Sequence, residues 1–132
     1  MIFYAFVDAG GYVSGAGSGH VLPVSALELP KDISPIVSIG MMLVGGAFVP
    51  RPDLPDPVIT QAERQGLTIQ FSDLPESTVA EIIDAAIGCS LGFEPEAKGL
   101  IQIELPDAGR YEIMLTPPRP YLPRSLNVEV NP

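Results

Sequence analysis

Apolar and polar residues alternate with a period of two in four separate runs in the second half of the chain. The apolar positions are Leu67, Ile69 and Phe71, then Ile101, Ile103 and Leu105, then Tyr111, Ile113 and Leu115, and last Leu126, Val128 and Val130. A period of two puts such side chains on one face of a β-strand. The pattern predicts at least four strands and an all-β fold class.

The first part of the chain predicts β-structure by a different signal, short apolar runs separated by glycines. "IFYAFVD" alternates bulky residues before an "AGG" turn, and a glycine-softened return arm follows, with a short strand near residues 26–29. The clearest signal is "IVSIGMMLVGGAFVP", two apolar arms around Gly45-Gly46, because glycine readily takes the positive φ angles of a type I′ turn. These runs predict a β-meander of four or five strands.

Residues 75–87 fit two structures. Val79, Ile82, Ile83, Ala86 and Ile87 have helical spacing, and Gly88 would suit the end of a short helix. The same residues also divide into two strands, "STVAEII" and "IGCSLGF", joined by "DAA". The β context on both sides favours strands over 77–88, since tertiary context often overrides propensity, but the helix stays open.

"PRPDLPDP", residues 50–57, is the best boundary between two modules. Its four prolines lack an N–H for a β-ladder and hold the chain extended. The sequence therefore predicts an N-terminal hairpin and meander module over residues 1–56, with a proline-rich linker at 50–57. A second module should occupy residues 58–132.

Size and charge limit the classes of partner. The 132 residues suit one compact domain or two small β modules, and a hydrophobic content of 46% is enough for a core. The net charge is −9; residues 1–56 carry two basic and five acidic residues, and the rest carry five and eleven. Because neither part is basic, we expect no nucleic-acid partner and no anionic membrane. An acidic surface serves solubility or suits a partner with a basic patch.

Neither a membrane span nor a secretory signal is expected. Residues 33–50 carry no charge, which approaches the length of a span, but two prolines and a Gly-Gly pair favour a buried hairpin. The first residues, "MIFYAFVDAGG", lack the basic start of a secretory signal. We therefore expect a soluble protein.

Few residues suggest catalytic chemistry. His20 is the only histidine and Cys89 the only cysteine, which excludes a zinc site made by these residue types; a surface histidine and a buried thiol are the expectations. "GAGSG", residues 15–19, lacks the Lys-Ser/Thr of a phosphate loop and predicts a flexible arm or wide turn. Glu94 and Glu96 indicate a solvated acidic loop. We expect no enzyme activity, cofactor or metal.

"TPPRPYLPR", residues 116–124, formally matches a proline-rich ligand with a flanking arginine. It also lies between two strongly alternating runs, where a rigid connection between strands is the favoured interpretation. In that position Tyr121 and Leu122 would cover the open end of the module, and the arginines would stay in solvent.

Three pieces of the second module are "LTIQFSDLPESTVAEI", "GLIQIELPDAGRYEIMLTPP" and "PYLPRSLNVEV"; the middle one has a strand, a turn with glycine, and a tyrosine on the next strand. They resemble the small immunoglobulin-like or transthyretin-like β-sandwich modules of tailed-phage and prophage structural proteins. "DISPIVSIGMMLVGGAFVPRP" is similar to N-terminal β segments of small tail-associated proteins. The resemblance implies a C-terminal β-sandwich.

The resemblance further implies a non-enzymatic virion subunit at the tail, baseplate or fibre attachment, made in the bacterial host cytoplasm, with the tail favoured over the head. A capsid decoration protein remains an alternative. So does an assembly chaperone or adaptor that is absent from the mature particle. The partners would be other virion proteins in a symmetric oligomer or multi-subunit assembly.

The first module also predicts a docking role from its composition. It has too few strands and too much glycine to bury its apolar residues by itself, so these need a cover from the second module or from a neighbouring subunit. The expected interaction residues are Phe3, Tyr4, Met41, Met42, Phe48 and Val49.

Overall fold

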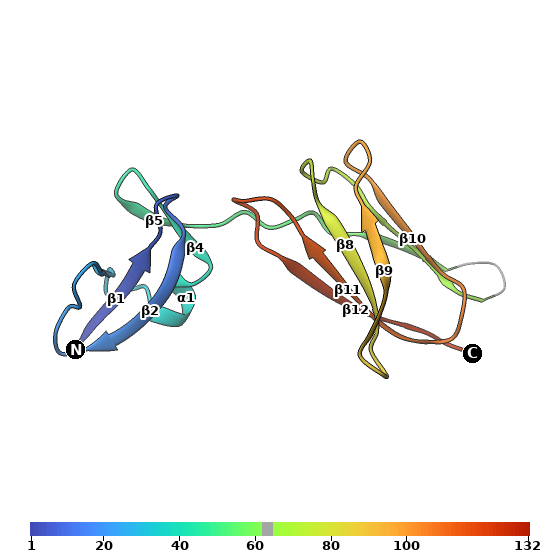
Figure 1. The fold of residues 1–132 in the computed structure, drawn as a ribbon, viewed down its shortest axis with the longest axis horizontal. Helices are drawn as coiled ribbons and strands as arrows, with labels where there is room; N and C mark the ends of the chain where they lie inside the picture. The colour runs from blue at the N-terminus through green and yellow to red at the C-terminus, as the bar shows by residue number, and fades with distance from the viewer. Residues whose placement is uncertain (62–64) are drawn as a thin grey trace. The chain divides into compact units, whose positions relative to one another are not determined.

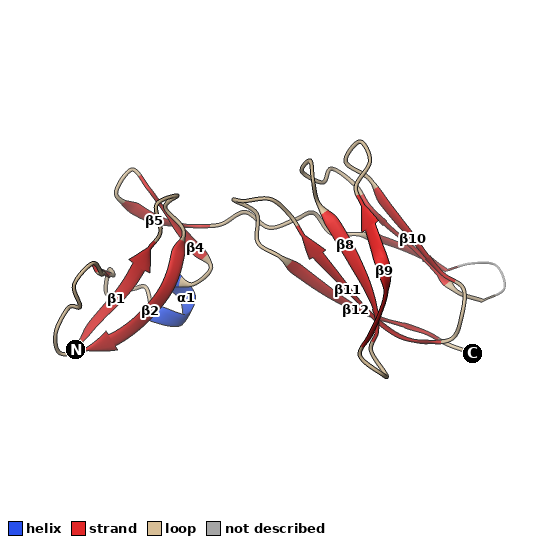
Figure 2. Ribbon diagram, in the orientation of Figure 1, coloured by secondary structure: helices blue, strands red, loops and turns tan. Residues whose placement is uncertain are grey.

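The computed structural model describes residues 1–61 and 65–132, and in these residues the chain is all-β apart from one short helix (Figure 2). It divides into two compact units, Met1–Arg51 and Pro52–Pro132, called the first and the second unit below. The predicted all-β class is confirmed. Each unit is described by itself.

The first unit consists of a three-stranded sheet, a helical turn and a hairpin (Figure 1). Its elements are β1 (Ile2–Val7), β2 (Val13–Gly19), β3 (Leu27–Glu28), α1 (Pro35–Ser38), β4 (Met41–Val44) and β5 (Ala47–Pro50). The sheet has the order β2-β1-β3, and both neighbours run antiparallel to β1. The expected short strand near residues 26–29 corresponds to β3.

The glycine-rich segment 15–19 is part of a regular strand, so the expected flexible arm or wide turn was wrong. In the β1–β2 register Tyr4 lies opposite Gly17, and Phe6 lies opposite Gly15. A Cβ atom built on Gly17 would come within 2.8 Å of the Tyr4 hydroxyl. The glycine therefore leaves room for the tyrosine ring, which lies over the strand. The Tyr4 and Phe6 rings meet edge to face, with 5.8 Å between their centroids.

The Gly45-Gly46 hairpin is confirmed, with φ angles of 57° and 82° at the two glycines. The arm before it differs from the prediction, because α1 takes the place of the expected strand there. The short helix that the sequence left open near residues 75–87 does not form, and α1 is the one helix among the described residues. Ser34 provides the N-cap and Pro35 the first helical position, a pairing that favours a helix start.

The second unit is a sandwich of two antiparallel sheets, with the orders β10-β7-β6 and β12-β11-β8-β9 among the described residues (Figure 1). Its strands are β6 (Val58–Gln61), β7 (Leu67–Phe71), β8 (Val79–Asp84), β9 (Cys89–Pro95), β10 (Ile101–Leu105), β11 (Gly109–Thr116) and β12 (Arg124–Val130). The predicted inward face of β7, β10, β11 and β12 is confirmed. Leu54 and Leu74 add to the core from loops, and most of its large side chains come from these four strands: Ile69, Phe71, Ile101, Ile103, Leu105, Tyr111, Ile113, Leu115, Val128 and Val130.

Tyr111 anchors the turn between β10 and β11. Its hydroxyl donates a 2.9 Å hydrogen bond to the backbone carbonyl of Asp107, four residues upstream. This geometry is the tyrosine corner found in immunoglobulin-like sandwiches. Burial, with the Asp107 and Asp84 carboxylates adding to it, raises the pKa of Tyr111 above its ordinary value.

Within residues 77–88, residues 79–84 form the strand β8 and residues 85–88 form the turn to β9, which is the strand alternative that the β context favoured. β8 pairs with both β11 and β9, and the fully buried Ala80 lies opposite Leu115 on the inner face. In the turn that follows, the Asp84 carboxylate accepts from the Ala86 N–H at 3.0 Å, and Gly88 takes a φ of 68°. Pairing on both sides and the burial of Ala80 between the sheets favour the strand here, so tertiary packing overrides the helical spacing of this segment.

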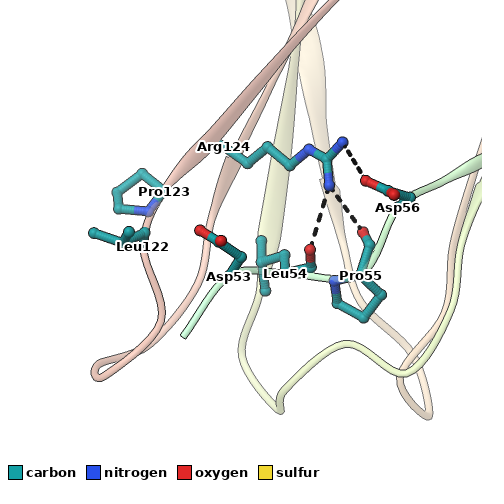
Figure 3. Close-up of a pocket in the computed structure, with 7 residues that line it drawn as sticks. All are labelled: Asp53, Leu54, Pro55, Asp56, Leu122, Pro123 and Arg124. Carbon is teal, nitrogen blue, oxygen red and sulfur yellow. Dashed lines mark hydrogen bonds and ion pairs between the residues drawn. The ribbon is translucent and has the colours of Figure 1, made fainter. Parts of the chain in front are cut away.

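The proline-rich segment after Arg51 belongs to the second unit, although the sequence suggested a linker over 50–57. Leu54 is buried in the core of that unit, and the Pro52 carbonyl accepts a 3.0 Å bond from the Leu122 N–H. The Arg124 guanidinium bonds to the carbonyls of Leu54 and Pro55, both at 3.3 Å, and pairs with the Asp56 carboxylate at 2.7 Å (Figure 3). We call residues 52–56 the strap.

The segment 117–123 joins β11 to β12, two neighbouring antiparallel strands, which confirms a connection between strands. Its turn is closed by a 3.2 Å bond from the Tyr121 N–H to the Pro118 carbonyl, and Tyr121 packs against the core. The expectation for the arginines was wrong at Arg124, which is half-buried and holds the strap.

Candidate docking surface

The six apolar residues expected to make contacts are all half-buried within the first unit: Phe3, Tyr4, Met41, Met42, Phe48 and Val49. None belongs to the strongly exposed apolar residues of that unit. Much of their surface is already covered by the unit's own strands.

The register also places these six residues on different faces. Phe3 and Tyr4 are successive residues of β1, so their side chains point to opposite faces of the sheet. On the hairpin, Met42 lies opposite Val49, whereas Phe48 lies opposite Leu43 on the other face. The six residues therefore do not form a single surface.

Phe48 lines a shallow hollow of about 620 Å³ together with residues that precede α1. Leu29 and Ile33 contribute apolar side chains, and Glu28 and Asp32 contribute carboxylates. Phe48 is the one predicted interaction residue that borders a recess among those found in the described residues.

One exposed apolar surface of the first unit surrounds α1, where Ile36, Val37 and Ile39 are exposed. We call residues 34–40 the apolar knuckle. The Ser34 hydroxyl accepts from the Val37 N–H at 3.4 Å, and the Gly40 N–H donates to the Val37 carbonyl at 3.3 Å. The Gly40 carbonyl in turn accepts a 3.1 Å bond from the Arg51 N–H. The knuckle is thereby tied to the end of the β4–β5 hairpin.

The burial of the knuckle is inverted relative to an ordinary surface helix. Ser38 is fully buried, and its hydroxyl donates a 2.7 Å hydrogen bond to the Pro35 carbonyl. Ile36, in contrast, is 86% exposed, and Val37 and Ile39 are exposed as well. A surface helix ordinarily turns its apolar side chains toward the core and its polar side chains outward.

The surroundings of the knuckle carry little charge. No charged residue occurs from position 33 to position 50, and residues 1–51 hold three acidic and two basic residues, a net charge of −1. A second exposed apolar segment, residues 21–24, lies before β3, where Val24 is 93% exposed. The first unit therefore presents uncharged apolar surface to solvent at two segments.

Sequence reasoning missed the knuckle because "IVSIG" was interpreted as the start of a strand. A signal was present, since Ser34-Pro35 is typical of a helix start and Gly40 follows one turn later. Those residues indicate a helical turn. They do not indicate which side of the turn is buried.

The other residues considered for chemistry lie in unremarkable surroundings. His20 is exposed, and Cys89 is exposed at the start of β9, so the expectation of a buried thiol was wrong. In the described ranges, no group of three or more His, Cys, Asp or Glu residues is placed to hold a metal ion. Within the same ranges no helix has the length and apolar content required to cross a membrane.

No protein-family model matches the chain, and neither does any curated protein or solved structure. The case for a function therefore depends on the geometry of the chain and on the resemblance of its sequence pieces.

Proposed function

We propose that the chain is a non-enzymatic structural subunit of a larger assembly and docks into it through the apolar knuckle of the first unit. The resemblance of its sequence supports a tailed-phage particle as the assembly. The place would be the tail, baseplate or fibre attachment, and the partners would be other virion proteins. The second unit is then the displayed part of the subunit.

The inverted burial of the knuckle carries this proposal. Exposed apolar surface is unfavourable by about 25 cal/mol per Å², so covering Ile36 and its neighbours would stabilise a complex. The turn cannot roll to bury Ile36 without exposing Ser38, which is buried and held by its bond to Pro35. A partner that covers the knuckle would bury Ile36 and leave Ser38 buried, without any change in the first unit.

The test is incorporation of a knuckle variant, Ile36→Ser with Val37→Ser, into particles produced by the bacterium that carries the gene. We expect the amount per particle, measured by quantitative mass spectrometry, to fall about tenfold or more, because an apolar anchor at the centre of an interface dominates its affinity. The matched control is Ile87→Ser, since Ile87 is similarly exposed but lies in the second unit.

Circular dichroism of both variants should match that of the unchanged chain, because the replaced side chains are exposed. Incorporation of the knuckle variant at the unchanged level would contradict the proposal. An equal loss for both variants would show that the knuckle has no special part in docking.

A further inference from the structure

The outer face of the four-stranded sheet in the second unit carries a row of side chains that the core does not use. In the register, Phe93 on β9 lies opposite Glu81 on β8, and Glu81 lies opposite Met114 on β11. The neighbouring residues Ala80 and Leu115 are buried in the core. Because successive side chains of a strand alternate between faces, the row points away from the core.

Phe93 and Met114 are the exposed apolar members of this row, at 66% and 41%. Phe93 is the one exposed phenylalanine of the five in the chain, all of which lie in the described residues. Leu91, near the register shift of β9, is exposed beside it. Phe93 and Leu91 thus lie on β9, the strand that ends the sheet, and Met114 lies two strands further in, on the other side of Glu81.

Carboxylates border these apolar side chains. Glu81 lies within the row itself, and Glu112 lies in the next row, opposite Ile83. The Ser125 hydroxyl donates to Glu112 at 3.1 Å, which orients that carboxylate on the outer face. This outer face therefore carries apolar and anionic side chains on neighbouring strands, with the basic residue Arg110 near the start of β11 on the same face.

We infer that this face of β8, β9 and β11 is a second binding surface, which takes a partner segment carrying both basic and apolar side chains. Apolar side chains of the partner would cover Phe93 and Met114, and its Lys or Arg side chains would reach Glu81 and Glu112. The surface lies in the second unit, so the inference does not rest on the knuckle.

The net charge of the second unit favours a basic partner for this surface. Residues 52–132 hold thirteen acidic and five basic residues, a net charge of −8. A second copy of the chain would therefore bring like charge to the surface, which opposes pairing, whereas a basic segment meets complementary charge. The edge strands β10 and β12 present polar outer faces, with Gln102 and Glu104 on β10, and Asn127 and Glu129 on β12.

The test is a titration of the ¹⁵N-labelled full chain with a short synthetic peptide that alternates lysine and valine. We expect saturable shifts of backbone signals confined to β8, β9 and β11, and none with a matched peptide that alternates glutamate and valine. Phe93→Ser should weaken binding about tenfold, and Glu81→Gln about fivefold.

Glu104→Gln is the matched control, because it removes the same charge from the outer face of the other sheet, and its effect should stay below about twofold. Equal weakening by Glu81→Gln and Glu104→Gln would mean attraction by overall charge, and it would overturn the inference. Shifts that map mainly outside β8, β9 and β11, or no binding of the lysine peptide, would overturn it as well.

Discussion

The first unit buries alanine and serine where the second buries phenylalanine and isoleucine. Ala5 and Ser38 are the fully buried side chains of the first unit. In the second, Phe71, Ile69 and Ile113 are buried to the same degree within one continuous cluster. Charge divides in the same way, with a net −1 in residues 1–51 and −8 in residues 52–132. The second unit thus has one continuous apolar core, whereas the first unit leaves several large apolar side chains exposed.

The difference does not follow from apolar content, because the first unit is the richer of the two, with 28 apolar residues in residues 1–51 against 33 in residues 52–132. In the second unit, alternation along β7, β10 and β11 places large side chains between two sheets. In the first unit, glycines on β2 and a two-residue β3 leave little sheet for the apolar side chains to pack on. Apart from Ala5, Ala26 and Leu29, its apolar residues therefore remain half-buried or exposed.

Truncation of a core side chain should separate the two units most clearly. Phe71→Ala removes a fully buried ring from the second unit and should lower its free energy of unfolding by about 3–5 kcal/mol. Phe48→Ala, its counterpart in the first unit, removes a half-buried ring and should cost about 1–2 kcal/mol. Urea unfolding of each full-length variant, followed residue by residue by NMR, measures both. Equal losses would break the comparison.

Release of the strap should have the next largest effect, and on the second unit alone. Arg124→Met keeps the length of the side chain but removes the bonds to Leu54, Pro55 and Asp56, so we expect a loss of about 1–2 kcal/mol. Arg110→Met removes the same charge from an exposed position of β11, and its effect should stay within about 0.5 kcal/mol. If the two variants unfold at the same urea concentration, the strap does not stabilise the unit.

Two glycine substitutions test how the first unit packs, because we expect them to change its stability differently. Gly17→Ala places a Cβ within 2.8 Å of the Tyr4 hydroxyl and should destabilise the first unit by about 1 kcal/mol. Gly15→Ala meets Phe6 only at 3.7 Å and should be neutral or stabilising by about 0.5 kcal/mol. Thermal unfolding of the full chain measures the difference. The same sign for both would argue against the packing of Tyr4 over β2.

The smallest effect expected is that of pH on the tyrosine corner. The pKa of Tyr111 is raised in the folded chain, so the neutral side chain stabilises the fold. This stabilisation is fully present below the unfolded pKa of about 10 and is lost as pH rises through the pKa of the folded chain. Tyr111→Phe should cost about 0.5–1 kcal/mol at neutral pH by removing the bond to Asp107. It should also reduce the alkaline loss of stability in the second unit. An unchanged alkaline profile would contradict this assignment.

The second unit could be predicted from the sequence more fully than the first. Alternation identified the inner faces that carry Ile69, Ile103, Ile113 and Val128. In a sheet with one buried face, alternating apolar residues fix which side chains of each strand point inward. Leu54 was not identified, since its burial depends on Arg124, which is seventy positions further along the chain. A contact between residues so far apart in the sequence leaves no pattern in the residues near Leu54.

The candidate docking surface was only partly predictable. Docking by the first unit followed from its composition, and it stays a prediction. The residues were selected by hydrophobicity, but exposure is decided by pairing: Met42 and Val49 cover each other across the hairpin, while Ile36 has no such partner in the register. The buried side of a four-residue turn depends on what packs beneath it, and the sequence of the turn does not contain that information.

The most direct test of the central proposal, that this chain is an assembly subunit, is its amount in purified phage particles from the organism that carries the gene. Quantitative mass spectrometry should find it at a low, fixed ratio to the tail subunits and far below the major capsid protein. A ratio close to that of the capsid protein would instead support capsid decoration. Absence from particles, with the chain abundant in the infected cell, would contradict the account and favour an assembly chaperone or adaptor.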